Sequence, residues 1–192
     1  MRASVNFLNT ASWRKRGLLV GNALMFQGAW FALMFASDSQ ALLLMCVLLA
    51  IHYYLYSPSF TEWKVIALVG ILGLFIDSFL IHFQYLPLEP NYWLGMTFAP
   101  WWLVCLWMAF AMTLYHSMAF LQKHLGITVL LSAIAAPWAY FAGGYLRGVT
   151  LTWQGLLAIA FIWAIWLPAL VYYISRNRVT ELNNSGIQPE EG

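Results

Sequence analysis

"WKVIALVGILGLFIDSFLIHF", residues 63–83, decides the fold class of this chain. Only two of its side chains carry a formal charge, Lys64 near the start and Asp77 well inside the run. An α-helix needs about 20 mainly apolar residues to cross a hydrocarbon core of roughly 30 Å, so the stretch predicts a membrane-spanning helix. The run is apolar on all sides, whereas strands of membrane barrels alternate polar and apolar residues.

The rest of the chain repeats this pattern. Of the 192 residues, 62% are hydrophobic and 8% are charged, a balance typical of proteins whose solvent is mostly lipid. Five more apolar runs of helical length are separated by polar or proline-containing breaks, at 17–36, 40–56, 98–121, 125–146 and 151–174. The sequence therefore predicts an all-α polytopic membrane protein, a bundle of six transmembrane helices.

The placement of Lys and Arg predicts how these helices are threaded. When six helices alternate across the membrane, eight of the nine cationic residues fall on one side and only Arg147 falls on the other. This is the positive-inside pattern, so both chain ends are expected in the cytoplasm. We expect three parts: a basic cytoplasmic N-terminus (1–16), a six-helix transmembrane domain (17–174) and a polar cytoplasmic tail without regular structure (175–192).

Asp77 shares a helix face with Gly70 and Gly73, at spacings of i, i+3 and i+7. Small residues let helices approach closely in lipid, so this carboxylate is predicted to point at a neighbouring helix. A rise of about 1.5 Å per residue from Lys64 places it roughly 20 Å into the bilayer, and Gln27 is the partner expected from its depth. Such a carboxylate serves as a proton or cation site, as a substrate-orienting group, or as a bond that fixes helix packing.

A second set of polar side chains falls in the cytoplasmic third of the predicted bundle. Its members are Asn22, His52, Thr113, His116, Ser117 and Ser132. His116 and Ser117 are candidates for lipid chemistry, but a histidine near a helix end is more often an interfacial residue. The same reasoning applies to His52, which lies beside three tyrosines.

Familiar catalytic and metal-binding motifs are absent from the sequence. It contains no nucleophile elbow, Walker motif, HExxH or CxxC, and Cys46 and Cys105 lie far apart inside apolar runs. We therefore expect neither a metal site nor a cofactor. No basic patch indicates a nucleic-acid partner.

Four stretches, taken in order, resemble a known family. They are "GNALMFQGAWF" (21–31), "GILGLFID" (70–77), "APWWLVCLWMAFAMTLYHSMAFL" (99–121) and "AAPWAYFAGGYLRG" (135–148). Together they are similar to an uncharacterised family of proteobacterial integral inner-membrane proteins, a domain-of-unknown-function family, over roughly residues 17–170. The resemblance implies a bacterial inner-membrane protein and, by gene association, a link to membrane-lipid modification; it supplies no activity. The positions it marks are Asn22, Gln27, Trp30, Asp77, Trp102, His116, Ser117, Pro137, Tyr140 and Gly143.

Three functions remain open from the sequence. A non-enzymatic component that binds lipid or scaffolds a partner enzyme is favoured, because no catalytic set is complete. A small proton-coupled transporter with Asp77 as its ionisable site would need to form a homo-oligomer, since six helices rarely enclose a full pathway. An intramembrane lipid-modifying enzyme would use His116, Ser117 and Asp77, although their heights differ by about 10 Å. The expected partners are membrane lipids, with either a homo-oligomer or a partner membrane enzyme.

Overall fold

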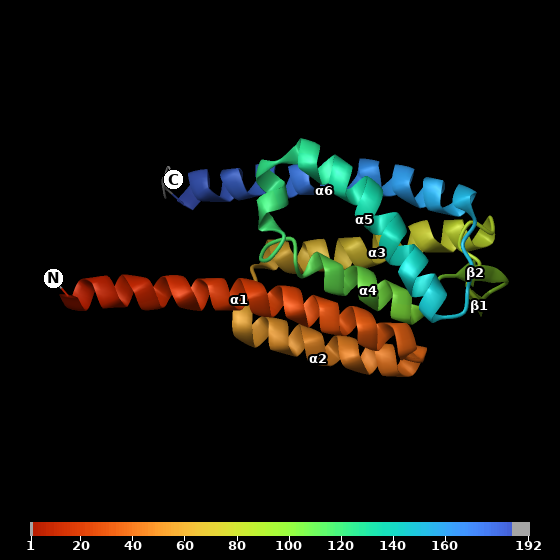
Figure 1. The fold of residues 1–192 in the computed structure, drawn as a ribbon, viewed down its shortest axis with the longest axis horizontal. Helices are drawn as coiled ribbons and strands as arrows, with labels where there is room; N and C mark the ends of the chain where they lie inside the picture. Colours follow the sequence, from red (N-terminus) through yellow and green to blue (C-terminus); the bar gives the residue numbers. More distant parts are fainter. Residues whose placement is uncertain (1, 186–192) are drawn as a thin grey trace. The chain divides into compact units, whose positions relative to one another are not determined.

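The computed structural model describes residues 2–185, and the side chains of residues 13–177 (Figure 1). Six α-helices lie within the described residues, so the prediction of an all-α bundle is confirmed. The chain divides between Met118 and Ala119 into two compact units, here called the N-terminal unit and the C-terminal unit. Five helices are long and apolar enough to cross a membrane, as expected of a multi-pass protein: Trp13–Phe35, Asp38–Tyr56, Phe60–His82, Leu125–Leu146 and Trp153–Asn177.

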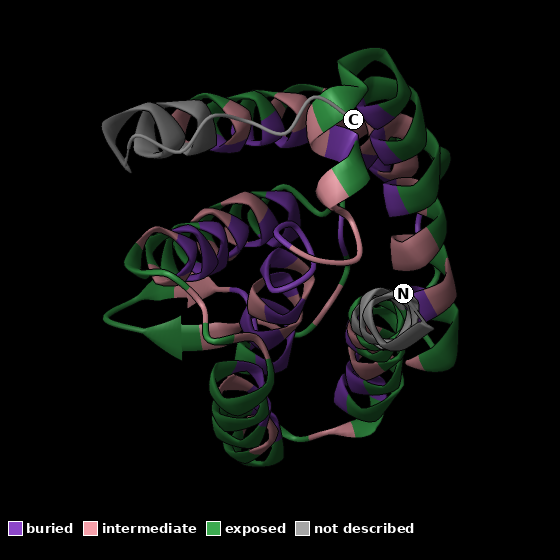
Figure 2. Cartoon of the chain, turned by 90° about the vertical axis from the view of Figure 1, so that its left-hand side faces the viewer, coloured by how far each residue is buried: buried purple, intermediate pink, exposed green. Residues whose placement is uncertain are grey.

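The N-terminal unit is built around its shortest helix. Its helices are α1 (Arg2–Phe35), α2 (Asp38–Tyr56), α3 (Phe60–His82) and α4 (Trp101–Ala111). α4 packs against each of the other three, and α1 also contacts α2. Figure 2 shows the buried residues gathered on the sides of these helices that face one another. Burial of α4 on several sides explains why nearly every residue along it is apolar.

α3 and α4 meet along the predicted glycine face. A Cβ atom placed on Gly70 would lie 2.8 Å from Met108 Cγ, and one placed on Gly73 would overlap the Trp107 indole. Asp77 is fully buried on the same face. The absence of a side chain at the two glycines is therefore what allows α4 to approach α3 this closely.

The turn between α2 and α3 is short and well capped. Ser57 ends α2 in the left-handed conformation, with φ of 46°. Ser59 is the N-cap of α3, and its hydroxyl accepts a hydrogen bond from the backbone N–H of Glu62 at 3.2 Å. The apolar run quoted from the sequence begins at Trp63, whereas α3 already begins at Phe60.

A small hairpin that the sequence did not predict joins α3 to α4. It consists of β1 (Asn91–Trp93) and β2 (Met96–Phe98), which are antiparallel. Leu94 and Gly95 turn the chain with positive φ angles of 50° and 76°, as tight hairpin turns require. The register pairs Asn91 with Phe98, Tyr92 with Thr97 and Trp93 with Met96.

Asp38, at the start of α2, ties this hairpin to the start of α4. One carboxylate oxygen accepts a hydrogen bond from Asn91 Nδ2 at 2.7 Å, and the other accepts one from the backbone N–H of Trp102 at 3.1 Å. The second bond satisfies a backbone donor in the first turn of α4, whose N-cap is Pro100. One side chain thus holds three elements together at this end of the N-terminal unit.

The fourth helix is shorter than predicted. The apolar run at 98–121 was expected to form one helix, but α4 ends at Ala111, residues 112–118 form successive turns, and η1 (Ala119–Lys123) follows. An apolar segment can leave the helical conformation where other groups satisfy its backbone. Here a side chain of α1 bonds to the backbone that follows α4.

The C-terminal unit consists of η1, α5 (Leu125–Leu146) and α6 (Trp153–Ser185). α5 and α6 pack against each other along their length, and η1 contacts both. Pro137 and Pro168 lie inside the two helices. In membrane helices, neighbouring groups can satisfy the carbonyls that a proline leaves unpaired.

The helices at the two chain ends are longer than predicted. α1 begins at Arg2, so the basic segment before residue 17 continues the first helix. α6 continues to Ser185, so the prediction of a tail without regular structure is wrong for residues 175–185. Residues 186–192 lie outside the described part of the chain. Polar composition therefore did not end either helix.

Candidate metal centre

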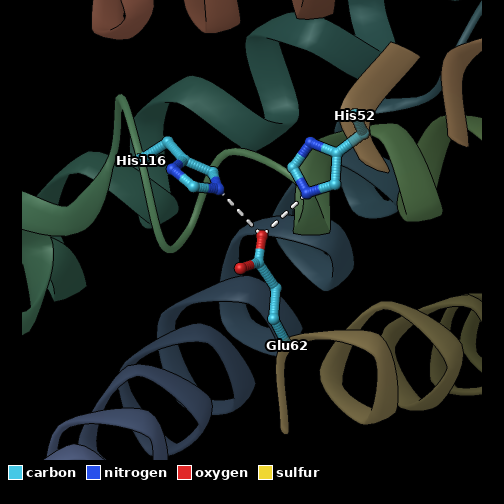
Figure 3. Close-up of side chains that lie close together, drawn as sticks. All are labelled: His52, Glu62 and His116. Atoms are coloured by element: carbon cyan, nitrogen blue, oxygen red, sulfur yellow. Dashed lines mark hydrogen bonds and ion pairs between the residues drawn. The ribbon is translucent and has the colours of Figure 1, made fainter. Parts of the chain in front are cut away.

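Three polar side chains converge at one end of the N-terminal unit, where α2 ends and α3 begins. His52 lies one turn before the end of α2, Glu62 lies in the first turn of α3, and His116 lies in the turns that follow α4. Figure 3 shows both imidazole rings directed at the Glu62 carboxylate. The three residues come from separate elements, so tertiary folding is what brings them together.

The geometry of this cluster is compact. Glu62 Oε1 lies 2.8 Å from His52 Nε2 and 2.9 Å from His116 Nε2. Exposure of the side chains is 0% for His52, 5% for Glu62 and 18% for His116. His52 and Glu62 are therefore buried, and the cluster is accessible at His116.

The local structure explains how Glu62 reaches both histidines. Residues 57–59 join α2 to α3, and across this short connection the His52 ring of α2 reaches the Glu62 carboxylate in the first turn of α3. Ser59 accepts the Glu62 N–H, so the backbone at Glu62 is held while its side chain points back toward His52. A carboxylate in the first turn of a helix is also favoured by the helix dipole.

His116 is presented by the segment 112–118, which α1 holds in place. Asn22 Nδ2 donates to the carbonyl of Met112 at 3.1 Å, at the start of the segment. At its other end, Ser117 donates to Asn22 Oδ1 from its hydroxyl at 2.6 Å and from its backbone N–H at 3.3 Å. These bonds replace helical backbone partners and let the chain leave α4 with its polar groups satisfied.

Aromatic rings form one wall of the cluster. The Tyr56 ring centroid lies 4.5 Å from that of His116 and 5.2 Å from that of His52. The Tyr56 hydroxyl donates to the carbonyl of Leu18 on α1 at 2.9 Å. Trp63 meets the His52 ring edge-on at 6.1 Å between centroids. This wall restricts the orientation of both imidazoles.

The donor set matches that of a transition-metal site. Each of the three residues offers one ligand atom, and these atoms all lie within 4.8 Å of one another. Two imidazoles and one carboxylate are typical of catalytic zinc sites and of non-haem iron sites. Zn²⁺ at about 2.1 Å from each ligand holds neighbouring ligand atoms roughly 3.4 Å apart, so the two Glu62–His distances of 2.8 and 2.9 Å would each lengthen by about half an ångström when an ion binds.

One of the two nitrogens of the His52 ring is not used in the contact with Glu62. Its Nδ1 is buried and has no hydrogen-bond partner among the described residues. Buried polar atoms in native proteins are nearly always paired, so an unpaired one within a cluster of metal-ligating groups is consistent with a ligand-binding role.

The other predicted site residues lie elsewhere. Asp77 is fully buried, and its Oδ2 accepts a hydrogen bond from Trp107 Nε1 at 2.6 Å. Gln27 was the expected partner on grounds of depth, but Gln27 is exposed, and a hydrogen bond reaches Asp77 from Trp107 on α4 instead. Tyr140 belongs to the C-terminal unit, where its ring meets Trp163 edge-on at 6.4 Å.

Sequence reasoning therefore found part of this cluster. It placed His52, His116, Asn22 and Ser117 at a common depth, and the structure brings His52 to His116 and Asn22 to Ser117. It overlooked Glu62, because an acidic residue at a helix start is ordinarily explained by capping and the helix dipole. A usable signal was that Glu62 comes directly before the apolar run at 63–83 and lies ten residues after His52, across a turn of serine and proline.

Comparisons with known proteins place the chain without assigning it an activity. A family model described as "Protein of unknown function (DUF2878)" matches residues 19–169. No curated protein and no solved structure matches the chain.

Proposed function

We propose that this chain, which belongs to the family described as a protein of unknown function (DUF2878), is a multi-pass membrane protein that binds a divalent transition-metal ion. Its ligands are His52, Glu62 and His116. The observation that carries the proposal is the convergence of both Nε2 atoms on one carboxylate oxygen, at 2.8 and 2.9 Å.

The type of ligand indicates the type of ion. Imidazole nitrogen suits Zn²⁺, Fe²⁺, Co²⁺ and Cu²⁺, whereas Mg²⁺ and Ca²⁺ prefer oxygen ligands. Three protein ligands leave at least one coordination position for water or another small ligand, as in catalytic zinc sites. The side-chain exposure of His116, 18%, supports access from that side.

The position of the cluster supports a setting at the cytoplasmic face of the bacterial inner membrane. It lies at the end of the N-terminal unit that carries the turn between α2 and α3. The positive-inside pattern assigns that turn, with nearby Lys64, to the cytoplasm, together with both chain ends. A metal ion bound there would lie near the level of the lipid headgroups.

Within that setting, the wider role that we propose is a non-enzymatic component that binds lipid or scaffolds a partner membrane enzyme, linked to membrane-lipid modification. A lipid-modifying enzyme is the alternative, and it is supported by the coordination positions that three ligands leave open. Incubating the purified protein with lipid vesicles and comparing the lipids before and after distinguishes the two, because only the enzyme alters lipid structure by its own chemistry. Deletion of the gene would change the lipids of a strain in either case.

The test of metal binding uses the full-length protein purified in detergent. After treatment with a chelator, the protein is titrated with Co²⁺, whose visible absorption reports binding, and Zn²⁺ is then added as a competitor. We expect one ion per chain. The variants His52→Ala, Glu62→Gln and His116→Ala should each weaken binding by more than about 100-fold, since losing even a second-shell partner typically costs 10–100-fold.

The matched control is His82→Ala. His82 is exposed at the other end of α3, where its ring lies 3.4 Å from the Thr97 hydroxyl, and it should leave Co²⁺ affinity unchanged. Mg²⁺ should not compete with Co²⁺. The proposal is overturned if the wild-type protein binds no Co²⁺ or if His116→Ala binds it as tightly as the wild type.

A further inference from the structure

We propose that Asn22 of α1 is a positioning residue that holds the ligand His116 toward Glu62. This inference rests on the proposed metal site and adds a residue that touches neither the ion nor its ligands. Asn22 is fully buried, although it belongs to a helix that contributes no ligand. Among the described residues, its amide bonds to the segment that carries His116.

The amide of Asn22 bridges the two ends of that segment. Nδ2 donates to Met112, the first residue after α4, and Oδ1 accepts from Ser117, the residue next to His116. Donor and acceptor of one side chain thus set the distance between positions five residues apart. No rotation of the amide by 180° preserves both contacts, so the arrangement is specific for Asn.

Packing also restrains the segment, since Met112, Thr113 and Leu114 are buried. Within it, the carbonyl of Thr113 accepts from the backbone N–H groups of His116 and Met118, at 3.0 and 2.9 Å. These local bonds shape the turn, but they do not tie it to another helix. The bonds to Asn22 do so, across 90 and 95 residues of sequence. Loss of Asn22 would free the His116 backbone to move away from Glu62.

A second contact of α1 supports the same assignment. Leu18, one turn before Asn22, accepts the hydrogen bond of Tyr56, whose ring lies 4.5 Å from His116. Gly21 faces this hydroxyl, and a Cβ there would lie 3.6 Å from it. One turn of α1 therefore holds both the backbone beside His116 and the ring against which His116 packs.

The experiment measures Co²⁺ affinity and the visible Co²⁺ spectrum of full-length Asn22→Ala in detergent. We expect binding about 10–100-fold weaker than in the wild type, the loss typical of partners that orient metal ligands, with an altered spectrum because one ligand is displaced. Gln27→Ala is the matched control. It removes an exposed amide from the same helix and should change neither reading.

A double-mutant cycle with Ser117→Ala separates positioning from general stability. Ser117→Ala removes one bond to Asn22 and should weaken Co²⁺ binding modestly in the wild-type background and not further in Asn22→Ala. If Asn22→Ala does not fold, a wild-type affinity and spectrum in Ser117→Ala overturn the inference by themselves. Wild-type affinity in Asn22→Ala overturns positioning alone, whereas a wild-type protein that binds no Co²⁺ overturns the metal site as well.

Discussion

Asp77 illustrates how much a single residue can reveal before its neighbours are known. Its spacing from Gly70 and Gly73 predicted a carboxylate directed at another helix, and the structure confirms its burial against α4. The partner could not be predicted, because depth in the membrane restricts height but not direction. The indole N–H of Trp107 reaches the carboxylate from α4 at 2.6 Å. The contact supports a role in holding α3 to α4.

Replacing Asp77 separates this packing role from transport. Asp77→Asn keeps a side-chain oxygen that can accept from Trp107, so the free energy of unfolding in detergent should change by less than about 1 kcal/mol. Asp77→Ala removes this acceptor and should lower the free energy of unfolding by about 1–3 kcal/mol. Thermal unfolding of the purified variants checks both values. A proton-coupled transporter would behave differently, because Asp77→Asn would fold normally and lose substrate uptake.

At the scale of elements, the ends of helices position the metal centre. α2 and α3 are joined by a turn of residues 57–59, and both start with a serine N-cap, Ser37 for α2 and Ser59 for α3. Only one of the two caps is close to the cluster. Ser37 precedes the start of α2, whereas His52 lies near the end of that helix, and Ser59 bonds to Glu62 itself.

These two caps give a matched pair of variants. Ser37→Ala and Ser59→Ala should each destabilise the protein by about 1 kcal/mol, the usual cost of losing an N-cap. Only Ser59→Ala should also weaken Co²⁺ binding, because it releases the backbone of Glu62. Thermal unfolding and Co²⁺ titration of both variants provide the measurement. Equal effects of the two variants on Co²⁺ affinity would contradict the link between the cap and the ligand.

For the whole molecule, the threading through the membrane depends on α4. Its 11 residues extend about 16 Å, which is shorter than the hydrocarbon core of roughly 30 Å. The segment 112–118 and η1 continue the chain beyond it, so a crossing here includes backbone that is not α-helical. Such backbone is tolerated in a membrane where protein groups satisfy it, as Asn22 does.

Reporter fusions test the proposed threading. A fluorescent protein that matures only in the cytoplasm should be bright at either chain end, because the positive-inside pattern predicts both ends there. Alkaline phosphatase, which is active only outside the cytoplasm, should be active when inserted near residue 89 or near residue 149 and inactive near residue 123. Phosphatase activity at one chain end would mean an odd number of crossings and would refute this threading.

Hydropathy and residue spacing were sufficient for the membrane class, the approximate helices and the inward face of α3, because each depends on side chains close together in the chain. The early end of α4 and the helical continuation beyond residue 174 were not predictable in this way. The first depends on hydrogen bonds from Asn22, 90 residues distant. The metal centre likewise unites residues separated by 10 and 54 positions, and its ligand distances exist only once α2, α3 and the segment after α4 have packed. Hydropathy averaged over neighbouring residues gives no information about such distances. They depend on the directions in which buried side chains point once the helices have packed.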